Sequence, residues 1–216
     1  MGKDFTKDGY FVLPETGSGP GVIVLHAWWG LNPFIKSFCE RLAQQGFVVF
    51  APDLYQGSVA QTIEDAKLLR AKLKQQQAHQ DLLKILSDFS ELEQIEGASV
   101  GLIGFSLGAR FALELSVGEH SPVRSVVTFY GNSQIDYSAS KAAYLCHFAE
   151  NDPYVALSGV KKLEKKMKAA QRSYTSYIYP GTTHWFFEED RTDSFDAYAA
   201  QIAWERTLEF LKEKLK

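Results

Sequence analysis

GFSLG, residues 104–108, lies between an apolar run and a helical pattern. The preceding run, 98–103, predicts a short buried strand, and apolar residues at helical spacing over 107–117 predict a helix directly afterwards. Strand, Gly-x-Ser-x-Gly and helix in this order are typical of a nucleophile elbow, a strained turn that exposes a reactive serine. The glycines two residues before and after Ser106 leave room for so tight a turn. Without this context, the pentapeptide would indicate an ordinary turn.

Length and composition are typical of a one-domain globular protein. The chain has 216 residues, of which 45% are hydrophobic and 23% charged, so it can bury a substantial core. Its formal net charge of −3 gives no basis for binding nucleic acid or an anionic membrane surface. Lysines clustered at 161–168 alternate with apolar residues and predict a solvent-facing helix surface. We therefore expect a single domain over residues 1–216, with neither nucleic acid nor a membrane as its partner.

The cysteines and the amino-terminal residues favour a cytoplasmic location. Cys39 and Cys146 both fall in predicted apolar elements, as expected of buried thiols in a reducing compartment. The first residues, MGKDFTKD at 1–8, lack the apolar run of a secretory signal. No run approaches the roughly 18 consecutive apolar residues that a membrane span needs.

Apolar runs alternate with helical patterns along the chain. Besides 98–103, strands are expected at 10–14 (an edge strand), 21–26, 47–50, 123–129, 143–149 and 173–179. Helices are expected at 33–45, in two pieces within 59–93, and at 107–117, 159–170 and 194–215. The expected inner face of the last helix comprises Ile202, Trp204, Leu208, Leu211 and Leu215. This alternation predicts an α/β fold, a mostly parallel doubly wound sheet with helices on both faces.

A histidine that activates the serine should follow a strand at the carboxyl edge of such a sheet. His79 and His120 do not follow a strand, and His147 falls inside one, where a core histidine is expected. His26 ends the expected strand 21–26, and His184 follows the expected strand 173–179. Doubly wound hydrolases have the order nucleophile, acid, histidine along the chain, which selects His184.

Asp152 is the expected acid that orients the histidine. It follows the strand 143–149 at a turn constrained by Pro153, which can direct the carboxylate towards the next loop. Glu150 and Asp136 are rivals in loops after strands. The alternative role for Asp152 is that of a helix N-cap.

Acyl transfer needs hydrogen-bond donors for the oxyanion that develops on the substrate. The backbone N–H of Leu107, just after the nucleophile, and that of Trp28, after the first buried strand, are expected to supply them. Trp29, Trp185 and Phe186 are expected to line an apolar substrate pocket. For Trp29 the alternative is simple packing.

Together these motifs resemble the dienelactone hydrolase family of α/β-hydrolases over nearly the whole chain. They are VIVLHAWWGLN at 22–32, GFVVFAPDLY at 46–55, GLIGFSLG at 101–108, NDP at 151–153 and GTTHWF at 181–186. The resemblance implies a compact α/β-hydrolase with Ser106 as nucleophile, Asp152 as acid and His184 as base. It also implies that no metal or organic cofactor takes part.

Three positions depart from the best-known members of that family. Those members use a cysteine nucleophile, where this chain has Ser106, and a glutamate that pairs with the cysteine, where it has Ala27. The two changes agree, because a serine can be activated directly by a histidine. The family's arginine, which holds the carboxylate of a dienelactone, is matched by Glu188. Glu188 would either repel a carboxylate from the pocket or belong to a solvated loop, and in both cases dienelactone is not the expected substrate.

We therefore predict a serine hydrolase that cleaves a small carboxylic ester or lactone through an acyl-enzyme intermediate. A thioesterase or acyl-protein esterase with the same three residues is the alternative enzyme. A catalytically silent binding protein on this fold is the alternative from another class, and the intact set of Ser106, Asp152 and His184 argues against it. The chain has no insertion large enough for a lipase-type lid, which favours small substrates.

Overall fold

The computed structural model describes Phe5 and residues 8–215, except for the side chain of Ala98. Most of residues 1–8, on which the expected cytoplasmic location partly rests, lies outside the described residues. That location therefore stays a prediction. Cys39 and Cys146 are both buried, as predicted. In the described part of the chain, none of the helices has the length and apolar character needed to cross a bilayer.

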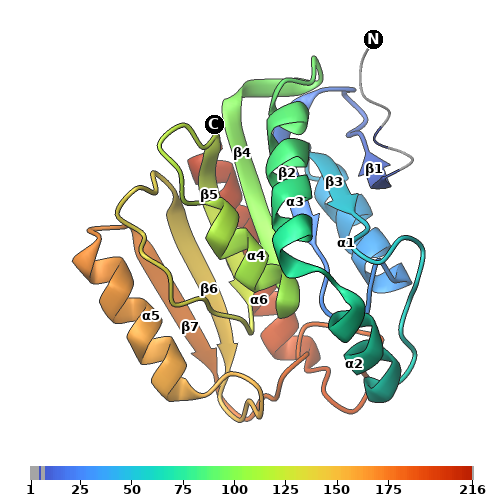
Figure 1. Cartoon of the computed structure of the whole chain (residues 1–216), viewed down its shortest axis with the longest axis vertical. Coiled ribbons are helices and arrows are strands. Elements are labelled where there is room, and N and C mark those ends of the chain that lie inside the picture. The colour runs from blue at the N-terminus through green and yellow to red at the C-terminus, as the bar shows by residue number, and fades with distance from the viewer. Residues whose placement is uncertain (1–4, 6–7, 216) are drawn as a thin grey trace.

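A seven-stranded sheet forms the centre of the molecule, in the order β1-β3-β2-β4-β5-β6-β7 (Figure 1). The strands are β1 (Gly9–Val12), β2 (Gly19–Leu25), β3 (Val48–Pro52), β4 (Ile95–Phe105), β5 (Val123–Phe129), β6 (Ala143–Ala149) and β7 (Tyr174–Tyr179). The edge strand β1 runs antiparallel to β3, and every other neighbouring pair is parallel. The predicted mostly parallel sheet is therefore confirmed, with the carboxyl ends of β2 to β7 at one edge.

Helices cover both faces of the sheet (Figure 1). One face carries α3 (Gln75–Ser90), α4 (Leu107–Leu115) and α5 (Leu157–Ala169), and the other carries α1 (Pro33–Ala43) and α6 (Ala197–Lys214). The remaining helix, α2 (Ile63–Lys72), precedes α3 beside the edge at which the parallel strands end. This arrangement confirms the doubly wound architecture, including the two helices within 59–93.

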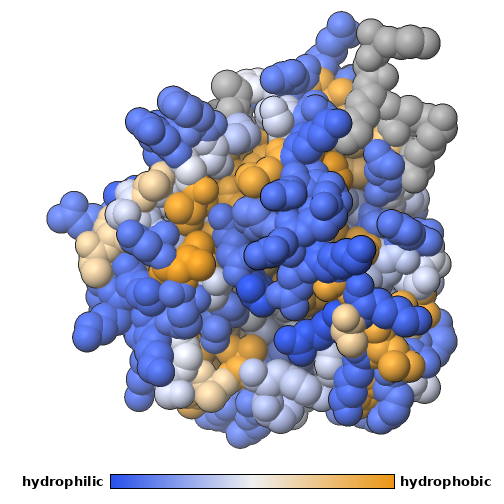
Figure 2. Space-filling view, viewed as in Figure 1, coloured by the Kyte–Doolittle hydropathy of each residue, from blue (hydrophilic) through white to orange (hydrophobic). Residues whose placement is uncertain are grey.

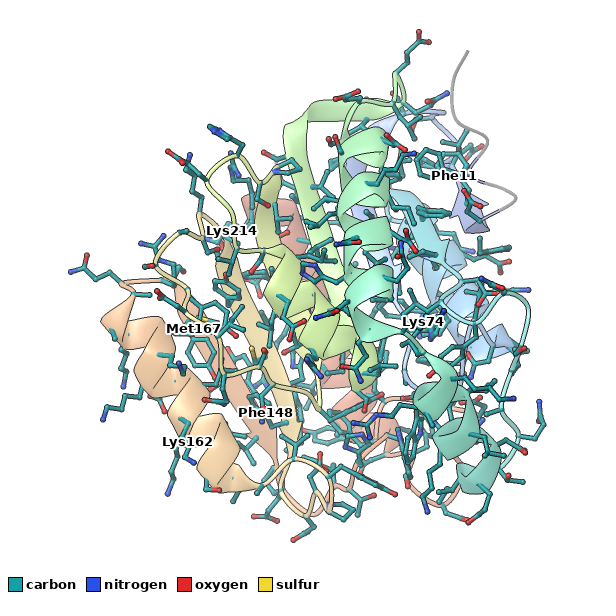
Figure 3. The ribbon with its side chains drawn as sticks, in the orientation of Figure 1. Phe11, Lys74, Phe148, Lys162, Met167 and Lys214 are labelled. Carbon is teal, nitrogen blue, oxygen red and sulfur yellow. The ribbon has the colours of Figure 1, made fainter. Side chains whose placement is uncertain are left out.

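The core lies in two layers between the sheet and its helices. Strand β6 is buried along its whole length, because helices cover both of its faces. Figure 3 labels Phe148 of β6 and Met167 of α5, both buried between that helix and the sheet. On the face shown in Figure 2, hydrophilic residues cover most of α3 and α5, and apolar residues show only in small groups.

Two expectations about these elements were wrong in part. Strand β4 has 11 residues rather than the short span 98–103, because Ile95 already pairs with Gly19 before a bulge. On α6, Ile202 and Leu208 are only partly buried, whereas Ala203 and Thr207 are fully buried. Trp204, Leu211 and Leu215 are buried as predicted, so the inner face combines large apolar side chains with the small Ala203 and Thr207.

Candidate active site

The predicted elbow forms a sharp turn between β4 and α4. Ser106 has φ 50° and ψ −104°, a conformation that non-glycine residues rarely adopt, so the surrounding structure must hold it in place. A side chain on Gly104 would place its Cβ 2.5 Å from the backbone of Ala109. A side chain on Gly108 would collide with the carbonyl oxygen of Leu25. Both glycines are therefore required for the turn, as the sequence pattern predicts.

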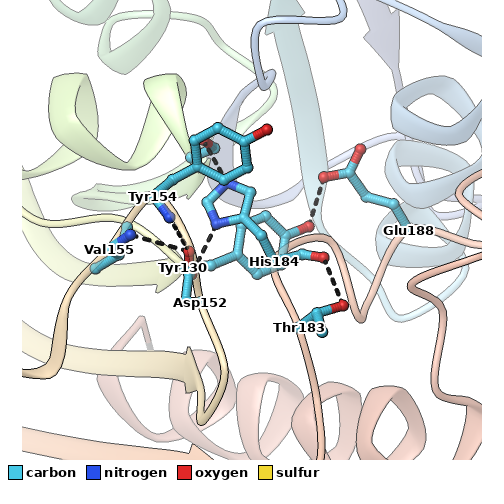
Figure 4. Close-up of polar contacts among 8 residues, drawn as sticks. Tyr130, Asp152, Tyr154, Val155, Thr183, His184 and Glu188 are labelled. Carbon is cyan, nitrogen blue, oxygen red and sulfur yellow. Dashed lines mark hydrogen bonds and ion pairs between the residues drawn. The ribbon is translucent and has the colours of Figure 1, made fainter. Parts of the chain in front are cut away.

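Three predicted residues meet at the carboxyl edge of the sheet. His184 Nε2 lies 2.9 Å from Ser106 Oγ, and His184 Nδ1 lies 2.7 Å from Asp152 Oδ2 (Figure 4). Since a carboxylate can only accept, Nδ1 carries the proton and Nε2 is free to accept the serine proton. Asp152 Oδ1 accepts the backbone N–H groups of Tyr154 and Val155 at 2.8 and 2.9 Å. These two bonds fix the carboxylate towards the imidazole.

The two rival acids are held by other groups. Glu150 Oε2 accepts the N–H of Gly181 at 2.9 Å. Asp136 accepts both the N–H and the hydroxyl of Ser138 at 2.9 Å. Of the three carboxylates considered, all within the described residues, only Asp152 contacts the histidine.

The other histidine at a strand end, His26, is fully buried and held by backbone groups. Its Nδ1 lies 2.6 Å from the carbonyl oxygen of Ala27, and its Nε2 accepts the N–H of Leu54 at 3.1 Å. Burial lowers the pKa of His26, which favours the neutral ring that this pair of contacts requires. Both nitrogens therefore have structural partners.

His147 is the core histidine that the sequence predicts. It is fully buried, with Nδ1 2.8 Å from the hydroxyl of Tyr179 and Nε2 3.1 Å from that of Thr207. Burial lowers its pKa to about 3, so the ring is neutral at physiological pH.

The two expected oxyanion donors stand at neighbouring strand ends. Leu107 is the first residue of α4, and an N–H at that position has no partner within its helix. Trp28 follows β2, which pairs directly with β4, the strand that leads into the elbow. The two backbone segments are therefore adjacent at the edge where the serine lies.

Aromatic rings surround the histidine. The indoles of Trp28 and Trp29 lie 6.0 and 5.3 Å from that of Trp185, measured between ring centroids, and the ring of Tyr154 lies 4.9 Å from His184. Tyr154 is 50% exposed and caps this cluster, although nothing in the sequence pattern singled it out. Its place after an Asp-Pro turn at the carboxyl edge was the available signal.

Phe186 does not line the pocket, contrary to expectation. It is fully buried, and its ring packs against those of Tyr130 and Tyr179 at 5.7 and 4.9 Å. The backbone at Trp185 is left-handed, with φ 65°, so the chain turns there and the next side chain enters the core.

Comparison with known proteins places this chain in a family. Residues 7–215 match the model of the dienelactone hydrolase family. The chain is 37% identical to "Protein usf" of Aquifex pyrophilus, over 96% of this chain and 93% of that one. It is 32% identical to the "Putative carboxymethylenebutenolidase" of Aquifex aeolicus, over 96% and 94%. The chain belongs to the dienelactone hydrolase family.

As a member of the dienelactone hydrolase family, the chain is an α/β-hydrolase and a carboxylic ester hydrolase. Its fold resembles the solved structure of a dienelactone hydrolase-like promiscuous phosphotriesterase from metagenomic libraries. The TM-score is 0.85 at 20% identity, over 99% of this chain and 96% of that one.

Glu188, at the position of the family's arginine, is neither solvated nor exposed in the pocket. Its exposed fraction is 1%, and its Oε1 accepts the hydroxyl of the fully buried Tyr130 at 2.6 Å. Burial raises the pKa of Glu188 to about 8, so the group is largely neutral at neutral pH. Both alternatives predicted for Glu188 are therefore wrong.

Tyr130 was also missed by the sequence analysis. A hydroxyl-bearing aromatic residue directly after β5 was the signal of a residue near the site.

Proposed function

We propose that this dienelactone hydrolase family member is a serine hydrolase that cleaves small carboxylic esters or lactones through an acyl-enzyme. One observation carries the proposal: an unbroken hydrogen-bonded chain from Asp152 through His184 to Ser106, which stands on a strained turn. A nucleophile, a base and an orienting acid in these positions are what acyl transfer by serine requires.

In the proposed acylation step, Ser106 Oγ attacks the carbonyl carbon while its proton moves to His184 Nε2, 2.9 Å away. Asp152 holds the imidazole in the tautomer that can accept this proton and stabilises the imidazolium that forms. The N–H groups of Leu107 and Trp28 would stabilise the tetrahedral oxyanion. Collapse of this intermediate breaks the bond to the alcohol oxygen, which takes the proton from His184.

Deacylation repeats these roles with water as the nucleophile. His184 takes a proton from water as it attacks the acyl carbon and returns that proton to Ser106 Oγ as the acyl bond breaks. The proposed cycle uses side chains and backbone donors alone. It ends with a carboxylic acid and the enzyme in its starting state.

The substrate class follows from the surroundings of the serine. The exposed Tyr154 and the half-buried Trp185 present aromatic surface beside His184, which suits a small substrate with apolar groups. Trp28 and Trp29 are buried and pack behind Trp185. A lactone is included because the Aquifex aeolicus relative is named a putative carboxymethylenebutenolidase, and a butenolide is a lactone. The proposed catalytic unit is a single domain acting in the cytoplasm, in keeping with the free buried thiols of Cys39 and Cys146.

A fluorophosphonate probe tests the proposed nucleophile. We expect the probe to label the purified protein at Ser106, located by peptide mass spectrometry, and to leave Ser106→Ala unlabelled. Turnover of matched esters, lactones and thioesters should then favour the oxygen esters and lactones. Labelling at another residue would exclude the proposed nucleophile, and a preference for thioesters would identify a thioesterase instead.

A further inference from the structure

A buried tyrosine–glutamate pair lies against the proposed catalytic histidine. Tyr130 follows β5 directly and donates its backbone N–H to the carbonyl oxygen of His147 at 2.7 Å. Its backbone is left-handed, with φ 39°, an unfavourable conformation for a bulky side chain. Such strain persists only where the surrounding contacts impose it, and it gathers at functional sites.

The loop that carries His184 contacts Tyr130 at two points (Figure 4). The imidazole of His184 packs on the tyrosine ring, with centroids 4.8 Å apart, and four residues later Glu188 accepts the tyrosine hydroxyl at 2.6 Å. A backbone bond from the Glu188 N–H to the carbonyl oxygen of Trp185, 2.9 Å, closes the turn between them. Tyr130 therefore packs against the imidazole while Asp152 and Ser106 bond to its two nitrogens.

A carboxyl group in the interior is costly unless a partner satisfies it. An apolar residue at position 188 would close the loop without that cost, and it would leave the tyrosine hydroxyl unpaired. Among the described residues, the side-chain hydrogen bond of Glu188 comes from the hydroxyl of Tyr130, whose ring packs on His184. Packing alone therefore does not account for this acid.

We propose that Tyr130 and Glu188 form a clamp that positions His184 for proton transfer to and from Ser106. This proposal rests on the function proposed above. Both are positioning residues, because they act through the imidazole and do not contact the reacting atoms.

The protonation state of Glu188 gives the clamp a pH dependence. Burial raises the pKa of Glu188 to about 8, with the charge of Asp190 acting in the same direction and Arg191 and the Tyr130 hydroxyl opposing them. Asp152 and Asp190 are the other acids whose charges act on Tyr130. Well below pH 8 most of the Glu188 carboxyl is neutral, whereas above pH 8 most of it is a carboxylate in a dry site near these acids. We expect this charge to loosen the loop, so kcat should fall as the pH rises past 8.

Three variants test the clamp. Tyr130→Phe removes the hydroxyl and should lower kcat by about tenfold or more with little change in KM, because a small misplacement of a catalytic group is costly. Glu188→Gln keeps an oxygen that accepts the hydroxyl but cannot ionise, so it should keep the wild-type kcat below pH 8 and lose the fall above it. Tyr137→Phe is the matched control, because Tyr137 is also fully buried and its hydroxyl donates to the Ser133 carbonyl at 2.9 Å, away from His184.

A second readout needs no substrate. The proton on His184 Nδ1, bonded to Asp152, gives a downfield proton NMR signal that reports how firmly the imidazole is held. We expect this signal to shift or exchange faster in Tyr130→Phe, and to remain unchanged in Tyr137→Phe.

The two readouts separate the clamp from the proposed function. If the NMR signal of Tyr130→Phe matches that of Tyr137→Phe, or if Glu188→Gln keeps the fall in kcat above pH 8, the clamp is overturned. Suppose instead that the wild-type protein neither hydrolyses esters nor reacts with the fluorophosphonate, yet the NMR signal of Tyr130→Phe changes as expected. The clamp then stands and the proposed function fails. Should Tyr130→Phe not fold, the pH profile of Glu188→Gln decides alone.

Discussion

His184 and His147 are both buried histidines whose two ring nitrogens are hydrogen-bonded. Their exposed fractions are 2% and 0%, so burial does not distinguish them. Their partners do: His147 contacts the hydroxyls of Tyr179 and Thr207, whereas His184 contacts a carboxylate and Ser106.

The difference shows what makes a buried histidine a candidate base. Two neutral hydroxyls satisfy a neutral ring but cannot compensate a positive charge, and burial lowers the pKa of His147 to about 3. The Asp152 carboxylate can stabilise the imidazolium that forms during proton transfer. The two residues also differ in their place relative to the strands, because His147 lies within β6 and His184 lies in the loop after β7.

Removing the group that His184 activates should have the largest effect. Ser106→Ala should lower kcat by about 10⁶-fold, because the acyl-enzyme cannot form. Steady-state hydrolysis of a short aryl ester measures this loss. Wild-type enzyme, diluted until it gives the same rate as the variant, shows how much contamination would account for the residual activity. Retention of wild-type turnover in the pure variant would remove the proposed distinction between the two histidines.

Changing the partner of His184 should have the next largest effect. Asp152→Asn keeps the shape of the side chain but removes the charge and favours the wrong imidazole tautomer, so kcat should fall by about 10⁴-fold. Glu150→Gln is the control, because Glu150 bonds to Gly181 and not to His184. Equal losses in the two variants would show that a nearby negative charge, and not the orientation of the ring, is what matters.

Replacing the core histidine should alter stability and leave catalysis intact. His147→Gln keeps polar contacts but loses ring stacking on Phe129, so it should lower the free energy of unfolding by about 2 kcal/mol at neutral pH and leave kcat within about twofold. Denaturant unfolding and ester hydrolysis measure the two effects. A loss of kcat as large as that of Asp152→Asn would give both histidines a catalytic role.

The same variant should also change the response to acid. Below the ordinary pKa of 6.5 the unfolded state protonates His147 while the folded state resists down to about 3, so wild-type stability falls as the pH drops through this window. Glutamine does not titrate, and His147→Gln should lose less stability than wild type between these two pH values. Parallel stability profiles for the two proteins would contradict a neutral buried His147.

The smallest expected effect comes from one partner of the core histidine. Thr207→Val keeps the shape of the side chain but removes the hydroxyl 3.1 Å from His147 Nε2, which should cost about 1 kcal/mol. Thermal unfolding measures the loss, and ester hydrolysis should be unchanged. A measurable loss of kcat would connect His147 to the active site through α6.

The fold was largely predictable because the elements carry clear local patterns. Continuous apolar runs mark β2, β5 and β6, and the strained turn at Ser106 is marked by the glycines that it requires. The predictions failed where tertiary packing, and not the spacing of apolar residues along the chain, decides which side chains are buried. On α6, Trp204, Leu211 and Leu215 are buried as predicted, but Ile202 and Leu208 are only partly buried. The small Ala203 and Thr207 occupy fully buried positions instead.

Chain order and position after strands were sufficient to nominate Ser106, Asp152 and His184, because parallel strands bring their carboxyl ends to one edge. Which way each loop side chain points was decided by the tertiary structure alone. Phe186 enters the core after a left-handed turn, and Glu188 turns inward to a tyrosine that lies 58 residues earlier in the chain. Local pattern records whether a side chain is polar, but the cost of burying it depends on a partner that only the folded chain supplies.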